Sequence, residues 1–140
     1  MFSPVKFSVL AAAIIAAAPA HAVPQPDAPV RAWSAMAGQP VPVLLRQAQD
    51  MPTSDMAVGD QPYCAADAEI EQTLDHDFAE TLIDAGGHQG MGTELWGSEQ
   101  MGTWTLVAAR DDGVSCIIAS GTGYSPQNEA VEYYTVAGLN

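Results

Sequence analysis

Apolar residues recur at every fourth position over residues 65–84. The stripe consists of Ala66, Ile70, Leu74, Phe78 and Leu82, with acidic and polar residues between its members. This spacing places the apolar side chains on one face of an amphipathic helix. Glycines at 86 and 87 follow, and glycine readily adopts the left-handed conformation that closes a helix. The pattern predicts one helix that must bury this stripe against another surface.

Three runs typical of β-strands follow the predicted helix, at 94–96, 103–109 and 114–119. They are rich in aromatic and β-branched residues, which suit a pleated, half-buried surface. Asp112 and Gly113 separate the second and third runs and form a strong hairpin signal. We therefore predict an α+β fold over residues 63–124, with one amphipathic helix packed on a three-stranded antiparallel β-meander. The pattern leaves open which sheet face meets the helix.

The flanking segments show no such regular pattern. Seven of the ten prolines fall in residues 23–62, which predicts a proline-rich, poorly ordered leader, part of which rests against the domain. Residues 125–140 are expected to be a C-terminal tail or an edge strand. Residues 1–22 have a basic start, a short apolar run and an Ala-His-Ala end, which are typical of a cleaved signal peptide. These features predict a periplasmic or secreted protein with no membrane anchor after cleavage.

The chain has two cysteines, Cys64 at the start of the predicted helix and Cys116 in the third strand run. In an oxidising compartment an even pair of cysteines predicts a disulfide. The alternative is two free thiols, one of them catalytic. The two cysteines are 52 positions apart. A disulfide that closes a loop of this length lowers the conformational entropy of the unfolded chain, which stabilises the folded state by about 4 kcal/mol. This contribution is comparable with the net stability of so small a core. The disulfide is therefore expected to staple the domain.

The formal net charge is −13, from 4 basic and 17 acidic residues. So negative a protein repels phosphate backbones, which argues against nucleic-acid binding. Asp75 and Asp77 belong to an acidic helix face that could meet a cationic envelope protein or could simply be solvated. Trp96 and Trp104 are either part of the same candidate partner surface or, as we expect, core residues.

Candidate chemistry is sparse. His88 and Met91 are ligand types that suit copper, so a periplasmic copper binder is one hypothesis; the alternative is a mobile glycine-rich connector. No Gly-x-Ser-x-Gly motif or phosphate-binding loop is present, and no catalytic residue or cofactor is predicted. The sequence favours a non-enzymatic binding or inhibitory module over a small hydrolase, without deciding whether the protein is an enzyme.

The stretch from Cys64 to residue 124 combines several short pieces: Cys64, Glu94-Leu95-Trp96, the run 102–107, Asp112-Gly113 and the run 116–121. This combination resembles a family of small secreted alphaproteobacterial proteins. Members of that family are uncharacterised. The resemblance therefore implies a signal peptide and a compact α+β domain, but it implies no activity and transfers no catalytic residue.

Overall fold

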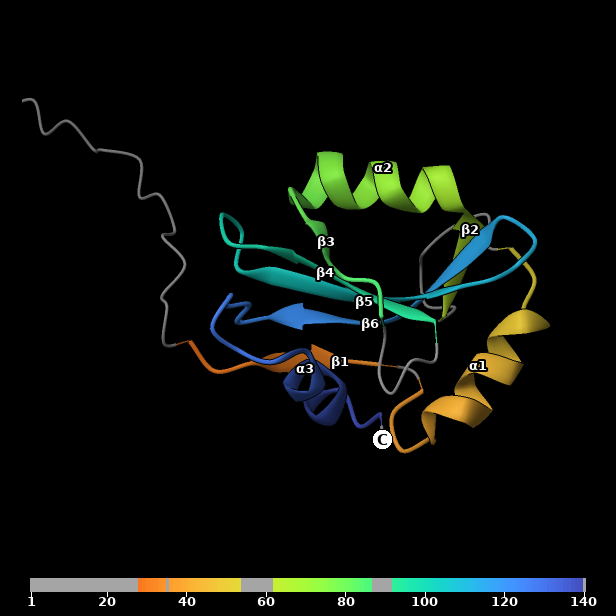
Figure 1. Cartoon of the computed structure of the whole chain (residues 1–140), viewed down its shortest axis with the longest axis horizontal. Helices are drawn as coiled ribbons and strands as arrows, with labels where there is room; N and C mark the ends of the chain where they lie inside the picture. Colours follow the sequence, from red (N-terminus) through yellow and green to blue (C-terminus); the bar gives the residue numbers. More distant parts are fainter. Residues whose placement is uncertain (1–27, 35, 54–61, 87–91, 140) are drawn as a thin grey trace, which may run out of the picture.

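The computed structural model describes residues 28–34, 36–53, 62–86 and 92–139 (Figure 1). The predicted signal peptide and the candidate copper ligands His88 and Met91 lie outside the described residues. The described part contains, in chain order, β1 (Arg31–Trp33), α1 (Val41–Gln49), β2 (Tyr63–Ala66), α2 (Asp67–Phe78), β3 (Thr81–Asp84), β4 (Thr93–Ser98), β5 (Thr103–Ala109), β6 (Val114–Thr122) and α3 (Ala130–Val136).

All six strands join one antiparallel sheet in the order β1-β6-β5-β4-β3, and β2 also pairs with β6. The strand β6 is nine residues long, so two short strands share its outer edge. β1 pairs with its end at residues 120–122, whereas β2 pairs with its start at residues 114–117. On this outer edge, Ile118 and Ala119 of β6 lie between the two pairings and have no strand beside them in the described part of the chain.

The prediction of one helix on a three-stranded meander is wrong. The three strand runs exist as β4, β5 and β6, and the Asp112-Gly113 turn joins the last two, with Gly113 at a φ of 77°. However, the sheet extends on both sides, by β3 next to β4 and by β1 and β2 next to β6. These added strands have only three or four residues each, which is too short for a pattern of alternating hydrophobicity to reveal them.

The helix α2 is shorter at both ends than the predicted helix. Ala65 and Ala66 belong to β2, and the helix ends at Phe78 because Ala79 adopts the left-handed conformation with a φ of 51°. An alanine in this conformation is uncommon, and no sequence signal marks it. Leu82, the last member of the predicted apolar stripe, therefore lies on the edge strand β3 and is 46% exposed.

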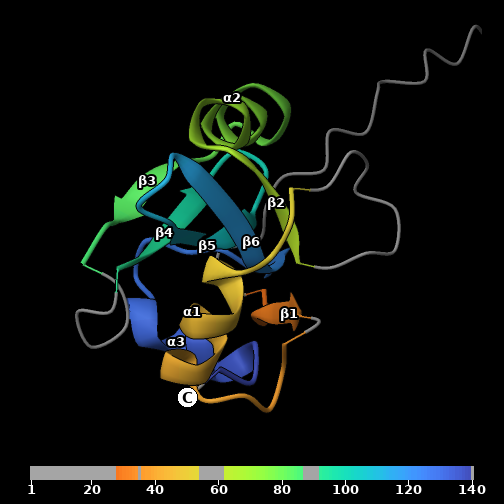
Figure 2. The same cartoon turned by 90° about the vertical axis from the view of Figure 1, so that its right-hand side faces the viewer.

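Helices cover both faces of the sheet (Figures 1 and 2). α2 lies on one face, where Ile70 and Leu74 pack with Trp96 and Val107 in the smaller core. α1 and α3 lie on the other face over the larger core, whose members include Leu44, Trp104, Leu106, Ile118, Tyr133 and Leu139. Side chains along β5 thus alternate between the two faces of the sheet. Trp104, Leu106 and Ala108 point toward α1 and α3, whereas Val107 points toward α2.

Part of the proline-rich leader belongs to the fold. β1 pairs with β6, and α1 buries Val41, Leu44 and Ala48 in the larger core. Pro42 is compatible with this helix because it lies in the first turn, where its missing N–H costs no helical hydrogen bond. At the other end of the chain, α3 stands where a tail or an edge strand is expected, and Tyr133 and Tyr134 anchor it in the core.

The predicted disulfide between Cys64 and Cys116 is present. The two residues are register partners in the β2–β6 ladder, their Cα atoms are 4.0 Å apart, and both are fully buried in the larger core. The bridge therefore joins two strands of the sheet. It ties β2, and through it the start of α2, to the centre of the fold.

Candidate functional site

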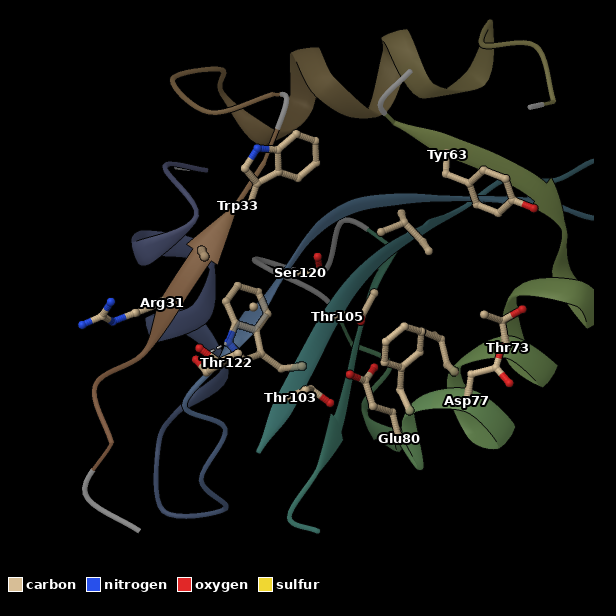
Figure 3. Close-up of a pocket in the computed structure, with 16 residues that line it drawn as sticks. Arg31, Trp33, Tyr63, Thr73, Asp77, Glu80, Thr103, Thr105, Ser120 and Thr122 are labelled. Atoms are coloured by element: carbon tan, nitrogen blue, oxygen red, sulfur yellow. Dashed lines mark hydrogen bonds between the residues drawn. The ribbon is translucent and has the colours of Figure 1, made fainter. Parts of the chain in front are cut away.

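A cleft of about 690 Å³ opens between α2 and the edge of the sheet at which β1 and β2 meet β6 (Figure 3). β5 and β6 form the floor of the cleft. One wall consists of α2 and Glu80, and β1 and β2 form the other walls. The two short strands bring Trp33 and Tyr63 to the cleft from opposite ends of β6. Ser120, which lies on the floor, belongs to the part of β6 that pairs with β1.

Aromatic side chains dominate the walls of this cleft. Trp33 of β1 is 55% exposed and Phe78 at the end of α2 is 43% exposed, which are large values for residues of this type. Tyr63 of β2 also lines the cleft, and its hydroxyl donates a hydrogen bond of 2.7 Å to Oε1 of Glu69 on α2. The walls therefore offer apolar surface to a ligand, and Tyr63 is held in a fixed orientation.

Glu80 lies at the inner end of the cleft and is only 1% exposed. Local backbone geometry places it there. The left-handed Ala79 reverses the chain after α2, and the N–H of Glu80 then donates to the carbonyl of Leu74 at 2.9 Å. This turn directs the Glu80 side chain toward β5, where Thr103 and Thr105 also line the cleft (Figure 3).

The buried carboxyl group of Glu80 lacks part of the hydrogen bonding that would offset the cost of its burial. Its Oε2 atom is buried without a hydrogen-bond partner, as is the Oγ1 atom of Thr103 beside it. Burial raises the pKa of Glu80 above its usual value of 4.5, because desolvation disfavours the charged form, and the hydroxyl of Thr105 opposes this effect more weakly. A buried polar atom without a partner is costly in a folded protein, so it marks a place where a ligand atom would be stabilised.

Replacing Glu80 by glutamine is expected to stabilise the protein more at pH 8 than at pH 4. Between the usual glutamate pKa and the raised pKa of the folded state, the folded protein binds more protons than the unfolded chain. The wild type therefore loses stability as the pH rises through this window, whereas Glu80→Gln has no such ionisation to oppose folding. Urea unfolding of both proteins at several pH values measures the difference.

The matched control for this experiment is Glu71→Gln, the same substitution at an exposed position of α2. Because water screens this side chain, we expect the control to change stability little at either pH, unlike Glu80→Gln. A Glu80→Gln difference that is the same at pH 4 and pH 8 would mean that the carboxyl ionises in the folded state as it does in the unfolded chain.

The structure separates the residues of the candidate partner surface. Trp104 is fully buried in the larger core and also borders the cleft; its Nε1 donates to the carbonyl of Thr122 at 3.1 Å. Trp96 packs in the smaller core on the opposite face of the sheet. Asp77 lines the cleft, whereas Asp75 lines a second hollow between α2 and β3. Of these four residues, Asp77 and Trp104 therefore line the cleft, whereas Asp75 and Trp96 do not.

The described residues contain no group of three or more histidine, cysteine, aspartate or glutamate side chains that could hold a metal ion. His76 is exposed on α2, and its Nδ1 lies 2.9 Å from Oδ1 of Asp77, whose hydrogen bond and charge raise the pKa of the imidazole. Because His88 and Met91 lie outside the described residues, the copper hypothesis stays a prediction.

Sequence reasoning missed Trp33, Tyr63 and Glu80 as site residues. The interval of four residues placed Glu80 on the outer face of an uninterrupted helix, and it left Trp33 and Tyr63 outside the predicted sheet. The only available signal was a large aromatic residue, Trp33, in an otherwise proline-rich segment, and this signal does not show what the side chain would contact.

No helix in the described segments combines the length and the hydropathy that a bilayer crossing requires. Comparison of the chain with known proteins gives no match among family models, curated proteins or solved structures. The resemblance to small secreted alphaproteobacterial proteins thus stays a prediction, and the cleft is the feature of the molecule that indicates a function.

Proposed function

We propose that this chain is a binding module, without enzymatic activity of its own, that holds a small and largely apolar ligand in the cleft. The observation that carries this proposal is the combination of an aromatic-walled cleft with one buried carboxyl oxygen, Glu80 Oε2, that lacks a partner. Small-molecule sites typically combine apolar walls with a few convergent polar groups that fix the ligand's orientation. The volume of about 690 Å³ lies within the range of such sites.

We further propose that the protein acts outside the cytosol, in the periplasm or as a secreted protein. The disulfide between Cys64 and Cys116 supports this location, because structural disulfides persist in oxidising compartments and are rare in the cytosol. The apolar run followed by Ala-His-Ala at residues 20–22 supports it independently. In such a compartment the ligand would come from the surroundings of the cell or from its envelope.

The proposed function predicts saturable binding of a neutral apolar dye, N-phenyl-1-naphthylamine, at one site per chain. Phe78→Ala is expected to weaken this binding about fivefold, because about 1 kcal/mol of apolar contact at the mouth of the cleft is lost. A fluorescence titration of the wild type and the variant measures the two dissociation constants.

Val131→Ala is the matched control, because Val131 is also a half-exposed apolar residue but lies on α3, on the opposite face of the sheet. We expect this variant to bind the dye as the wild type does. Equal weakening by both substitutions, or dye binding that does not saturate, would show that the dye adsorbs to general apolar surface and would count against the cleft.

A further inference from the structure

The charges that face the interior of the cleft are negative. Asp77 and Glu80 both lie on its α2 side, and the wider chain carries a formal net charge of −13. Among the described residues that line the cleft, Arg31 is the one basic residue, and its exposed side chain extends away from the cleft (Figure 3). A negative potential in a low-dielectric cleft concentrates cations and repels anions. The ligand is therefore expected to carry a positive charge or no charge.

The unpartnered oxygen of Glu80 favours a charged donor over a neutral ligand. A cation that reaches Oε2 would give this buried atom the partner that it lacks and would pair with the ionised carboxylate. A hydrogen bond between a charged donor and a carboxylate is roughly twice as strong as a neutral one. A neutral ligand would gain only one ordinary hydrogen bond from the same group.

The aromatic walls suit the same kind of ligand. Trp33, Tyr63 and Phe78 line the cleft on three sides, from β1, β2 and α2 respectively. The face of an aromatic ring attracts an organic cation, and this attraction is strongest where water is excluded. The same rings bind the apolar part of the ligand through hydrophobic contact. The aromatic walls thus complement the apolar body of such a ligand, and the Glu80 carboxyl group complements its charged group.

From this arrangement we propose that the cleft binds a lipophilic organic cation, an amine with an aromatic or alkyl body, whose ammonium group pairs with Glu80 and lies near Asp77. This inference rests on the proposed binding function and specifies its ligand class. It also gives Glu80 a role as the anionic partner of the ligand. Without a ligand, the burial of this acid only lowers the stability of the protein.

Binding of such a ligand is expected to release a proton from Glu80. Burial raises the pKa of this carboxyl in the free protein, and a bound ammonium group lowers it again by favouring the ionised form. The affinity should therefore rise with pH until Glu80 is ionised in the free protein. The other ionisable groups around Glu80 are Asp77, Tyr63 and Arg31 of the cleft, and Glu71 and Asp75 of the hollow behind it.

Three probes of equal length test the proposal: 4-phenylbutylamine, 4-phenylbutanol and 4-phenylbutyrate, which are positive, neutral and negative at pH 7.5. In calorimetric titrations of the full chain, the amine is expected to bind about tenfold more tightly than the alcohol. The carboxylate is expected to bind most weakly. Repeating the amine titration at several lower pH values, in buffers of different ionisation enthalpy, should reveal proton release in the range where Glu80 is protonated in the free protein.

Variants then locate the selectivity. Glu80→Gln should reduce the preference for the amine to about threefold or less, abolish the proton release and keep the binding of the alcohol. Asp77→Asn should reduce the preference by about threefold, as expected for a more exposed charge. Glu132→Gln, which removes one acid on α3 on the opposite face of the sheet, should leave the preference unchanged.

The outcomes separate this inference from the function on which it rests. If all three probes bind equally and Phe78→Ala weakens all of them, the cleft is a binding site but not one for cations. If Glu80→Gln and Glu132→Gln reduce amine binding alike, the preference comes from the net charge of the surface, and the inference is wrong. If none of the probes binds while the neutral dye does, the inference is likewise wrong and the binding function stands.

Discussion

Replacing Cys64 and Cys116 together by alanine is expected to lower the free energy of unfolding by about 4 kcal/mol. The disulfide closes a loop of 52 residues, and its loss returns the corresponding conformational freedom to the unfolded chain. Urea unfolding of the oxidised wild type and of the double variant measures this difference. As a control, the double variant is unfolded with and without reductant. Its free energy of unfolding should be the same in both, because it has no disulfide to reduce.

The same substitution should weaken the site. The register partners next to the bridge are Tyr63 and Ile117, and both line the cleft. β2 has only four residues, so the disulfide makes a large contribution to its attachment to β6. We therefore expect dye binding to weaken in the double variant even under conditions in which it remains folded. Unchanged stability of the variant would show that hydrogen bonds and packing alone hold β2 in place.

The sequence predicted the parts of the fold that have a long, regular pattern. α2 and the strands β4, β5 and β6 lie where the apolar periodicity and the Asp112-Gly113 turn place them, apart from shifts at their ends. The cysteine pairing followed from the even count and the expected compartment. These predictions depend on local rules, namely the period of a helix, the alternation of a strand and the geometry of a tight turn.

The remaining elements depend on tertiary contacts that no local rule reveals. β1, with three residues, is a strand only because β6 offers its backbone partners, and Gly121 lets the two strands approach closely, since a Cβ atom there would lie 1.8 Å from the carbonyl oxygen of Arg31. α1 forms within a proline-rich segment because Val41, Leu44 and Ala48 find a core to enter. Local propensity is overridden by such burial.

The candidate site was hidden for the same reason. Its main polar group, Glu80, occupies its buried position because Ala79 adopts a left-handed conformation that an alanine rarely adopts. An uninterrupted helix would have turned Glu80 toward solvent. Trp33 and Phe78 meet at one cleft although they are 45 positions apart in the chain, and they do so only because β1 and the end of α2 border the same part of the sheet.

Replacing Trp104 by alanine is expected to lower the free energy of unfolding by about 3–5 kcal/mol. The indole is fully buried, its ring centroid lies 5.1 Å from that of Tyr133, and its Nε1 donates to the carbonyl of Thr122. The substitution removes this packing and leaves a cavity between the sheet and α3, which the surrounding residues can fill only in part.

Trp33→Ala provides a matched comparison, because it removes the same side chain from a position that is 55% exposed. Its cost in stability is expected to be about 0.5 kcal/mol, as for most surface substitutions, whereas dye binding should weaken. The two tryptophans thus separate folding from ligand binding: Trp104 supports the floor of the cleft from within the core, and Trp33 lines its mouth. Equal costs in urea unfolding would contradict this division, since they would require Trp33 to be packed as tightly as Trp104.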